Sequence, residues 1–200
     1  MNDVSDPTYW SALYQANDAG WDKGRCAPPI ARMLREGFLS PRAHVAVIGC
    51  GPGHEAVEAA RLGFHVTAID FAPEAISAVQ GRAAEWGLSL EAVEADVFHL
   101  AKLWPQGFDA IIEHTCLCAI DPVRRQEYMQ TVSGALKPCG VLFGLFYAHT
   151  RPEGPPFSIH NLEVRQLLVP HFECERLIIA LDSFENRSGY ELEFIARRRD

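Results

Sequence analysis

Residues 44–55 read HVAVIGCGPGHE, and Asp70 follows nineteen positions after Gly51. The apolar residues at the start of this stretch are typical of a strand that is buried on both faces of a parallel sheet. Three glycines within five positions allow a sharp turn and a close approach of the backbone to a ligand. The stretch therefore predicts a strand that runs into a nucleotide-binding turn.

A helix and a second strand are predicted after the turn. Residues 53–63 are rich in helix formers and end on a glycine, so the free N–H groups at the helix start point back to the turn. Residues 64–69 form the second strand and place Asp70 at its carboxyl end. In an open α/β sheet, an acid at this position can accept both ribose hydroxyls of an adenosine ligand.

The glycine spacing distinguishes two cofactors. The glycines stand at positions 49, 51 and 53, and His54 occupies the position where the dinucleotide fingerprint G-x-G-x-x-G has its last glycine. This spacing is similar to motif I of the S-adenosylmethionine-dependent methyltransferases, which use the turn to approach the methionine part of the cofactor. An NAD-dependent oxidoreductase is a disfavoured alternative. The other alternative is that the glycines only make a tight bend and bind no ligand.

The rest of the chain alternates between strands and helices. The pattern predicts helices over 73–87 and 100–104, a helix that starts at Asp121-Pro122 and stops at 137–140, a helix over 161–169, and strands over 90–95, 108–113, 141–147, 175–181 and 190–197. Residues 182–189 are too few for a crossover helix, so the last two strands must pair antiparallel. With right-handed connections, this pattern resembles the methyltransferase fold. The resemblance implies a three-layer, Rossmann-like α/β fold whose mainly parallel, seven-stranded sheet has the order 3-2-1-4-5-7-6 and an antiparallel last strand.

Composition favours one domain over residues 1–200, with a lid or helical segment over 1–40 and a sheet core over 44–196. The chain has 48% hydrophobic and 22% charged residues and a formal net charge of −8. This charge argues against nucleic acid as a partner. No apolar stretch reaches the ~18 residues of a membrane span, and the polar start lacks the features of a signal peptide. We expect a cytoplasmic protein without a membrane partner.

The six cysteines contain no C-x-x-C pair and no zinc-like spacing with histidine, so reduced thiols and no metal site are expected. Cys116 and Cys118 are predicted at a strand end, where both point to the same side. Small buried side chains are the favoured interpretation of this pair, ahead of a redox role.

The chain also resembles the thiopurine S-methyltransferase superfamily, including its plant thiol and halide methyltransferase branch. The matching segments are Tyr9-Trp10-x-x-x-Tyr14, Gly20-Trp21-Asp22-x-Gly24-Arg25, Phe108-Asp109-Ala110-Ile111-Ile112-Glu113-His114, Cys118-Ala119-Ile120-Asp121-Pro122 with Arg125, Gly154-Pro155-Pro156-Phe157 and Leu181-Asp182-Ser183-Phe184-Glu185-x-Arg187. Tyr14 replaces a tryptophan of the family pattern, and Gly20 replaces a proline. The resemblance covers residues 9–196.

The resemblance implies roles in binding S-adenosylmethionine. Trp10, Tyr14 and Trp21 would form an aromatic lid with cation–π attraction to the sulfonium, and Gly49, Gly51 and Gly53 would lie along the methionine part. Asp70 would bind the ribose, Phe71 would cover the adenine face, and Asp96 with the Val97 backbone would bind the adenine amino edge. His114 would lie near the cofactor. The structural alternatives are aromatic anchoring of a terminus for the lid residues, a core position for Phe71 and a solvated turn for Asp96.

Two residues are candidates for the acceptor side. The family commonly has an acid and a tyrosine where this chain has Glu113 and His114. Because an imidazole titrates near neutral pH, His114 is a candidate base or acceptor-positioning group, weighed against an ordinary polar side chain. Arg125 could attract an anionic acceptor, with a solvated helix charge as the alternative.

The predicted activity is methyl transfer from S-adenosylmethionine to a small-molecule acceptor, foremost the sulfur of a small thiol. Halides and the oxyanions of selenium or tellurium are alternative acceptors. Transfer from a sulfonium to an anion merges opposite charges, so a closed, dry site favours the reaction and a metal is unnecessary. We expect a monomer or weak dimer. A non-catalytic S-adenosylmethionine-binding protein is the alternative from another class.

Overall fold

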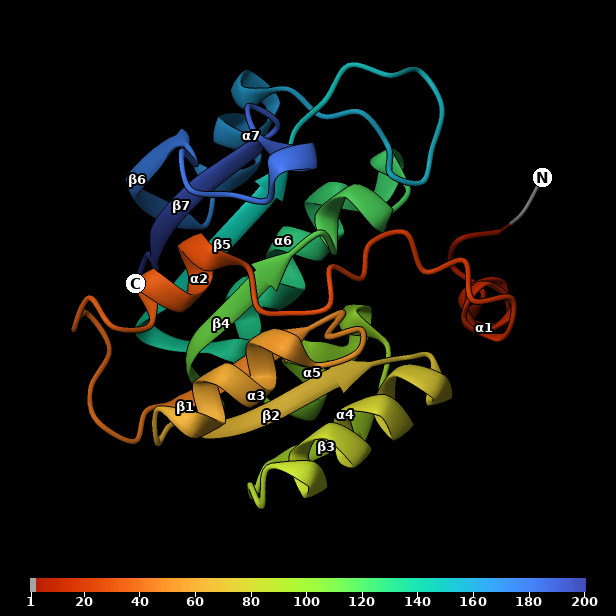
Figure 1. The fold of residues 1–200 in the computed structure, drawn as a ribbon. Helices are drawn as coiled ribbons and strands as arrows, with labels where there is room; N and C mark the ends of the chain where they lie inside the picture. The colour runs from red at the N-terminus through yellow and green to blue at the C-terminus, as the bar shows by residue number, and fades with distance from the viewer. Residues whose placement is uncertain (1–2) are drawn as a thin grey trace.

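The computed structural model describes residues 3–200, and its strands form one seven-stranded sheet of order β3-β2-β1-β4-β5-β7-β6 (Figure 1). The strands are β1 (His44–Ile48), β2 (His65–Asp70), β3 (Glu91–Glu94), β4 (Phe108–His114), β5 (Leu136–Tyr147), β6 (Phe172–Ile179) and β7 (Glu191–Arg198). The first two residues of the predicted segment 1–40 lie outside the described residues.

Helices and short 3-10 turns connect these strands. The α-helices are α1 (Pro7–Gln15), α2 (Pro28–Met33), α3 (His54–Arg61), α4 (Pro73–Glu85), α5 (Leu100–Leu103), α6 (Arg125–Ala135) and α7 (Asn161–Leu168). The 3-10 turns are η1 (Val97–His99), η2 (Leu117–Ala119), η3 (Pro122–Arg124) and η4 (Glu185–Arg187). None of the helices within residues 3–200 combines the length and apolar character needed to cross a membrane.

The predicted fold is confirmed. Strands β1 to β5 pair in parallel, and β7 lies antiparallel between β5 and β6. The short connection between β6 and β7 requires this hairpin, because a parallel pair needs a crossover. In Figure 1 the arrowheads of β2, β4 and β5 point toward the side of the molecule on which α1 lies.

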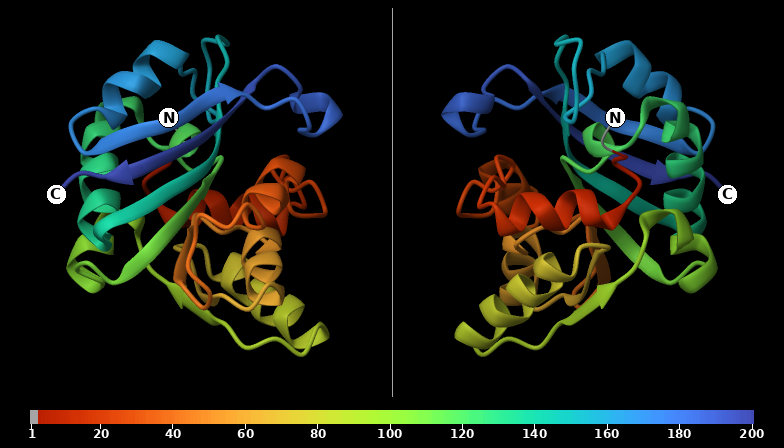
Figure 2. Two further views of the ribbon diagram at one scale, coloured as in Figure 1. Left: turned by 90° about the vertical axis from the view of Figure 1, so that its left-hand side faces the viewer. Right: turned by 90° about the vertical axis from the view of Figure 1, so that its right-hand side faces the viewer.

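The sheet separates two hydrophobic cores because successive strand residues point to opposite faces. On β1, Val45 and Val47 belong to the core under α2, α3 and α4, whereas Ala46 and Ile48 belong to the core under α5, α6 and α7. Figure 2 shows the two groups of helices on opposite sides of the sheet. The result is a three-layer arrangement in which the helices leave the carboxyl edge of the strands free for α1 and the loops.

Hydrogen bonds and ion pairs tie the amino-terminal segment to this edge. Helix α1 begins after Asp6, whose carboxylate accepts a hydrogen bond from Thr8 N at 2.8 Å. On the same helix, Ser11 donates to Glu74 of α4 at 2.7 Å. In α2, Arg32 forms ion pairs with the buried Glu193 of β7 and with Asp182. The segment before β1 therefore contacts both α4 and β7.

Two local predictions were wrong. Strand β5 begins at Leu136 instead of 141, because Leu136 pairs with Phe108 before a register shift, and residues 137–140 belong to the irregular start of the strand. Cys116 and Cys118 lie in the turn around η2, after β4 has ended at His114. The buried positions predicted for these two cysteines are confirmed.

Candidate functional site

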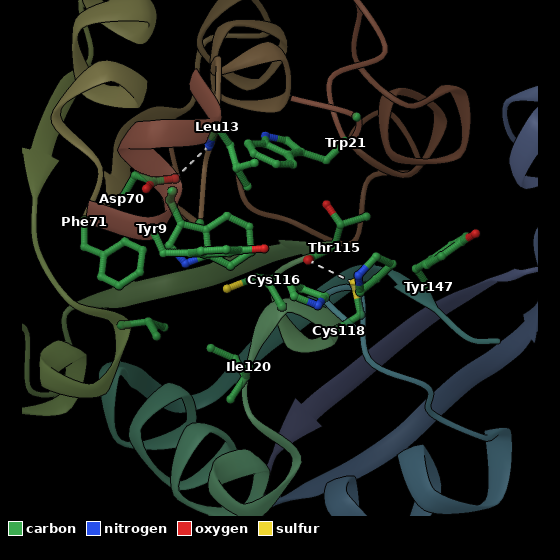
Figure 3. A pocket seen from close by; sticks show the side chains of 18 of the residues that line it. Tyr9, Leu13, Trp21, Asp70, Phe71, Thr115, Cys116, Cys118, Ile120 and Tyr147 are labelled. Carbon is green, nitrogen blue, oxygen red and sulfur yellow. Dashed lines mark hydrogen bonds between the residues drawn. The ribbon is translucent and has the colours of Figure 1, made fainter. Parts of the chain in front are cut away.

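A cavity of about 590 Å³ opens at the carboxyl edge of the sheet, between α1, the strand ends and the loops that follow β4, β5 and β6 (Figure 3). It is lined by nine of the eleven residues predicted to bind the cofactor, which are Trp10, Tyr14, Trp21, Gly49, Gly51, Asp70, Phe71, Asp96 and Val97. Gly53 and His114 are absent from its lining. The strand order places these residues together, because β1, β2 and β3 are neighbours whose carboxyl ends share one edge.

The glycine turn is built around the Asp70 carboxylate. Gly51 N donates to Asp70 Oδ2 at 3.0 Å, and Ala72 N donates to Asp70 Oδ1 at 3.0 Å. These backbone hydrogen bonds act to lower the pKa of Asp70, but burial outweighs them and raises it. Gly51 has a φ of +52°, and a Cβ there would lie 3.5 Å from the Tyr14 hydroxyl. The turn thus leaves a shallow cradle beneath the lid aromatics.

Gly53 serves helix packing. Its φ is +81°, and a Cβ on Gly53 would lie 2.5 Å from Val79 Cγ2 on α4. Since Gly53 does not line the cavity, the structure gives no contact for its predicted role along the methionine part. The glycine lets α3 and α4 approach each other closely.

The predicted lid residues form one aromatic cluster over the turn. The Trp10 and Tyr14 rings both meet the Trp21 ring edge to face, with centroid distances of 5.5 and 5.3 Å. Trp21 Nε1 donates to the Tyr14 hydroxyl at 3.3 Å. Burial and the charge of Asp70 raise the pKa of Tyr14, so the phenol stays neutral.

We call the part of the cavity around Asp70, Phe71 and Asp96 its acidic end. Asp96 caps η1 by accepting a hydrogen bond from Phe98 N at 2.9 Å. Ala95 N donates to the Asp70 main-chain carbonyl at 2.9 Å, which fixes the two acids relative to each other. In Figure 3, Phe71 and Asp70 lie on the side of the cavity opposite Tyr147.

A strained turn forms the floor of the cavity. Thr115 has a φ of +62°, which is unusual for a β-branched residue and costs energy that the surrounding structure must offset. The turn brings Cys116, Cys118 and Ile120 under the cavity (Figure 3). Burial raises the pKa of the Cys116 and Cys118 thiols, so both remain protonated.

Beneath this turn, the buried Glu113 carboxylate accepts a hydrogen bond from Leu117 N at 2.8 Å through Oε1. Its Oε2 has no hydrogen-bond partner among the described residues. Burial raises the pKa of Glu113 to about 7.

His114 lies behind the cavity wall. Its Nδ1 is 3.1 Å from Glu55 Oε1, and its Nε2 is 3.3 Å from Glu191 Oε1. Burial alone would lower its pKa, but the charge of Glu55 and the hydrogen bonds to both carboxylates raise the pKa of His114 to about 9. Because an imidazolium already carries its proton, this geometry does not support the predicted role as a base.

Arg125 also lies outside the cavity lining. The residue is 2% exposed, and its side chain donates to Glu163 Oε1 at 2.7 Å and to the Ser158 carbonyl at 3.0 Å. These bonds join the start of α6 to α7 and to the segment before it. Arg125 therefore has its partners in the protein, and the structure gives no contact for its predicted attraction of an acceptor.

Sequence reasoning assigned no role to the residues opposite the acidic end. We call this part the basic end and define it by the cations Lys23, Arg151 and Arg187 with the aromatic Tyr147. Arg151 Nη2 donates to the Tyr147 hydroxyl at 2.8 Å. The Arg187 guanidinium lies 5.4 Å from the Tyr147 ring centroid. Burial and the nearby Arg187 charge lower the pKa of Lys23.

A signal for the basic end was present in the sequence. Arg187 stands in the turn over residues 181–187 that supports the family resemblance, and Arg151 precedes the Gly154-Pro155-Pro156-Phe157 loop. Pro155 and Pro156 also line the cavity. The motifs marked the segments, but only the folded chain shows that their charges face one cavity.

Comparison with known proteins gives the same family as the sequence motifs. The family model of thiopurine S-methyltransferase (TPMT) matches residues 5–193. Thiocyanate methyltransferase 1 of Brassica oleracea is 30% identical over 169 residues. Probable thiol methyltransferase 2 of Arabidopsis thaliana is 29% identical over 164 residues. Each alignment covers 80% of this chain and 71% of the relative.

Solved structures share the fold. The 1,6-didemethyltoxoflavin-N1-methyltransferase of Burkholderia thailandensis, with bound 1,6-didemethyltoxoflavin and S-adenosylhomocysteine, has a TM-score of 0.77 at 20% sequence identity. The match covers 97% of this chain and 87% of that chain. The family match identifies the chain as an S-adenosylmethionine-dependent methyltransferase that belongs to the thiopurine S-methyltransferase family.

Proposed function

We propose that this methyltransferase methylates small anionic nucleophiles, foremost the sulfur of a small thiol in its thiolate form. The observation that carries the proposal is the basic end of the cavity, where Lys23, Arg151 and Arg187 face the same space. Three cations at one end favour a negatively charged acceptor there. The names of the plant relatives, a thiocyanate and a thiol methyltransferase, agree with an anionic or sulfur nucleophile.

The acidic end fits the methyl donor. Asp70 keeps lone pairs toward the cavity beyond its two backbone bonds and can accept the ribose hydroxyls. Phe71 can cover the adenine, and Asp96 with the Val97 backbone can pair with its amino edge. The cradle at Gly51, which a larger side chain would narrow, leaves room for the methionine part. S-adenosylmethionine, when bound, supplies a methyl group on a cationic sulfonium.

The residues of this chain contribute orientation, water exclusion and charge. Trp10, Tyr14 and Trp21 cover the turn and shield the cavity from water, and their rings attract a cation beneath them. We propose accordingly that the segment up to residue 40 acts as a lid. Since a free thiol has a pKa near 8.5, neighbouring cations raise its thiolate fraction by stabilising the charged form. No general base is required for this step.

Halides, thiocyanate and the oxyanions of selenium or tellurium are a second class of acceptor that the same cations favour. These anions need no loss of a proton, whereas a thiol does. The ratio between the two classes therefore reports how strongly the basic end promotes thiolate formation.

The test is product analysis by mass spectrometry. The protein is incubated with S-adenosylmethionine and, separately, a small thiol, iodide, thiocyanate, selenite and tellurite, with a neutral amine as control. We expect S-methylation of the thiol, and methylation of the other anions would assign the second class. Binding of S-adenosylhomocysteine without turnover of any acceptor would instead favour a non-catalytic binding protein and would refute the proposal.

A further inference from the structure

A buried cluster of charged side chains lies directly behind the basic end. We call it the His114 cluster and define it as His114, Glu55, Glu191 and Arg187. Glu191 is 0% exposed, Arg187 6% and Glu55 8%. The four residues come from β4, α3, β7 and η4, which are far apart in the sequence. Only Arg187 reaches the lining of the large cavity.

One oxygen of Glu191 contacts both the histidine and the cavity arginine, and Arg187 Nη1 also lies 3.1 Å from His114 Nε2. Glu191 Oε1 accepts from Arg187 Nη1 at 2.9 Å, and the same atom lies 3.3 Å from His114 Nε2. The other oxygen of Glu191 accepts a hydrogen bond from the Ser183 hydroxyl. Arg187 Nη2 donates to the main-chain carbonyl of Trp21 in the lid at 3.1 Å. The carboxylate of Glu191 thus holds the guanidinium by one edge while the other edge reaches the lid.

The cluster is balanced in charge. Glu55 and Glu191 contribute two negative charges, and His114 and Arg187 contribute two positive charges. Burial acts to raise the pKa of Glu191, but His114, Ser183 and Arg187 outweigh it and lower this pKa to about 2. Burial acts to raise the pKa of Glu55 as well, but the charge and the hydrogen bond of His114 outweigh burial, so the pKa of Glu55 is lowered. Both carboxylates are therefore ionised at neutral pH.

The charged neighbours of His114 come from several elements. Glu55 lies on α3, Glu191 on β7 and Arg187 on η4, and Glu113 precedes it on β4. A small cavity of about 30 Å³ beside His114 is lined by further titratable groups. These groups are Asp22, Lys23, Arg25 and His54. Asp22 and His54 bond to each other at 2.8 Å, which leaves the two carboxylates of the cluster as the hydrogen-bond acceptors of His114.

We propose that His114 is a positioning residue: through Glu191 it fixes the Arg187 guanidinium in the cavity wall, and so sets the affinity for an anionic acceptor. The inference rests on the proposed function, because it assumes that the basic end binds the acceptor. His114 itself touches neither cofactor nor acceptor in this assignment. It acts as the cation between two buried carboxylates, with Glu55 at Nδ1 and Glu191 at Nε2.

Loss of the His114 charge has a specific consequence. A neutral side chain at this position leaves the cluster with one excess negative charge, which draws Arg187 toward Glu55 and Glu191 and weakens the positive potential of the cavity. The acceptor anion is then bound less tightly. Binding of S-adenosylhomocysteine at the acidic end changes little, because that end is separate from the cluster.

The binding experiment uses thiocyanate as the probe anion and the full chain saturated with S-adenosylhomocysteine. Calorimetry of His114→Gln is expected to show about a tenfold loss of thiocyanate affinity, which corresponds to about 1.4 kcal/mol of binding free energy. Affinity for S-adenosylhomocysteine should stay within about twofold. His44→Gln is the matched control. His44 is the first residue of β1, so it lies at the amino end of the strand, away from the carboxyl edge that carries the cavity, and its ring bonds to Thr67. Equal thiocyanate affinity in His114→Gln and the wild type would overturn the proposal.

A double-mutant cycle tests the route through Arg187. In an Arg187→Gln background, His114→Gln should cause no further loss of thiocyanate affinity, because the residue that it positions is gone. Losses that add independently would overturn the positioning role. For a thiolate acceptor, His114→Gln alone should raise KM more than it lowers kcat. A general loosening of the fold would instead lower kcat and the melting temperature together.

Histidine titration by NMR separates this inference from the proposed function, because it needs neither turnover nor ligand. In protein labelled at histidine, we expect His114 to remain protonated at pH 7.5, and we expect its pKa to fall in Glu191→Gln because one of its two carboxylate partners is then neutral. Titration of His114 near 6.5 in the wild type would refute the cluster. If the pairing is observed but no anion binds, the proposed function fails while the assignment of the cluster stands.

Discussion

The two ends of the cavity are built in different ways. The acidic end and the glycine turn beside it come from three neighbouring parallel strands, β1, β2 and β3, each of which delivers its residues at its carboxyl end. The basic end collects Lys23, Arg151 and Arg187 from an amino-terminal loop, the loop after β5 and the turn before β7. The acidic end follows from local motifs and sheet topology, whereas the basic end depends on how distant loops pack. Each end should therefore respond separately to mutation.

The largest effect is expected from Asp70→Ala. The change removes an acceptor of two backbone bonds and of the proposed ribose contacts, so affinity for S-adenosylhomocysteine should fall by about 100-fold in calorimetry. Asp109→Ala is the control, because Asp109 also accepts two hydrogen bonds, from His44 N and Lys137, but lies outside the cavity. Unchanged affinity in Asp70→Ala would remove the acidic end as the donor site.

The next effect concerns stability. Gly53→Ala places a methyl group 2.5 Å from Val79 Cγ2 and forces an L-residue into a φ of +81°. We expect a loss of about 2 kcal/mol in the free energy of unfolding, measured with denaturant. Gly63→Ala is matched in φ at +87° but has open space around it, so it should lose less. Equal losses in both variants would show that helix packing does not explain Gly53.

The cavity floor between the two ends should depend on pH through Glu113. Its pKa is raised to about 7 by burial, so the folded state binds this proton more tightly than the unfolded state. The resulting stability is fully present below the unfolded pKa and is lost as pH rises through about 7.

Relative to Glu113→Gln, the wild type should lose about 1.4 kcal/mol per pH unit at most between pH 5 and 7. Thermal and denaturant unfolding at both pH values measure this difference. Parallel stability curves for the two proteins would contradict the assignment.

The smallest effect is expected from Arg151→Gln. Arg151 is exposed and bonds the Tyr147 hydroxyl, so solvent screens its charge. KM for an anionic acceptor should rise about threefold at low salt and less at high salt, with unchanged affinity for S-adenosylhomocysteine. Arg165→Gln, an exposed arginine on α7 outside the cavity, should change neither value. An equal rise for a neutral acceptor would mean that charge is not the reason.

Sequence reasoning succeeded where structure follows from local chemistry. The strand order, the antiparallel hairpin and the place of Asp70 at the carboxyl end of β2 are as expected. Alternating burial along strands, turn glycines and short connections restrict the chain to few arrangements. The predicted aromatic residues Trp10, Tyr14 and Trp21 also meet in one cluster.

The environment of titratable groups could not be predicted in the same way. His114 was a candidate base or acceptor-positioning group because an isolated imidazole titrates near neutral pH, but its protonation depends on Glu55 and Glu191, which other elements supply. Arg125 was expected to attract an acceptor, and its partners Glu163 and Ser158 come from a later segment. A pKa depends on burial and on charges within a few ångströms, and these distances do not appear in a linear pattern.

The sequence by itself determined the sheet, the glycine turn and the acid beside it, because hydrophobic period, turn chemistry and strand direction act over a few residues. Tertiary structure alone decided which charges face the cavity and which are neutralised behind it. Lys23, Arg151 and Arg187 meet only when three loops fold over one edge of the sheet. Electrostatic interactions depend on separation in space, so the acceptor side of this methyltransferase is defined by packing.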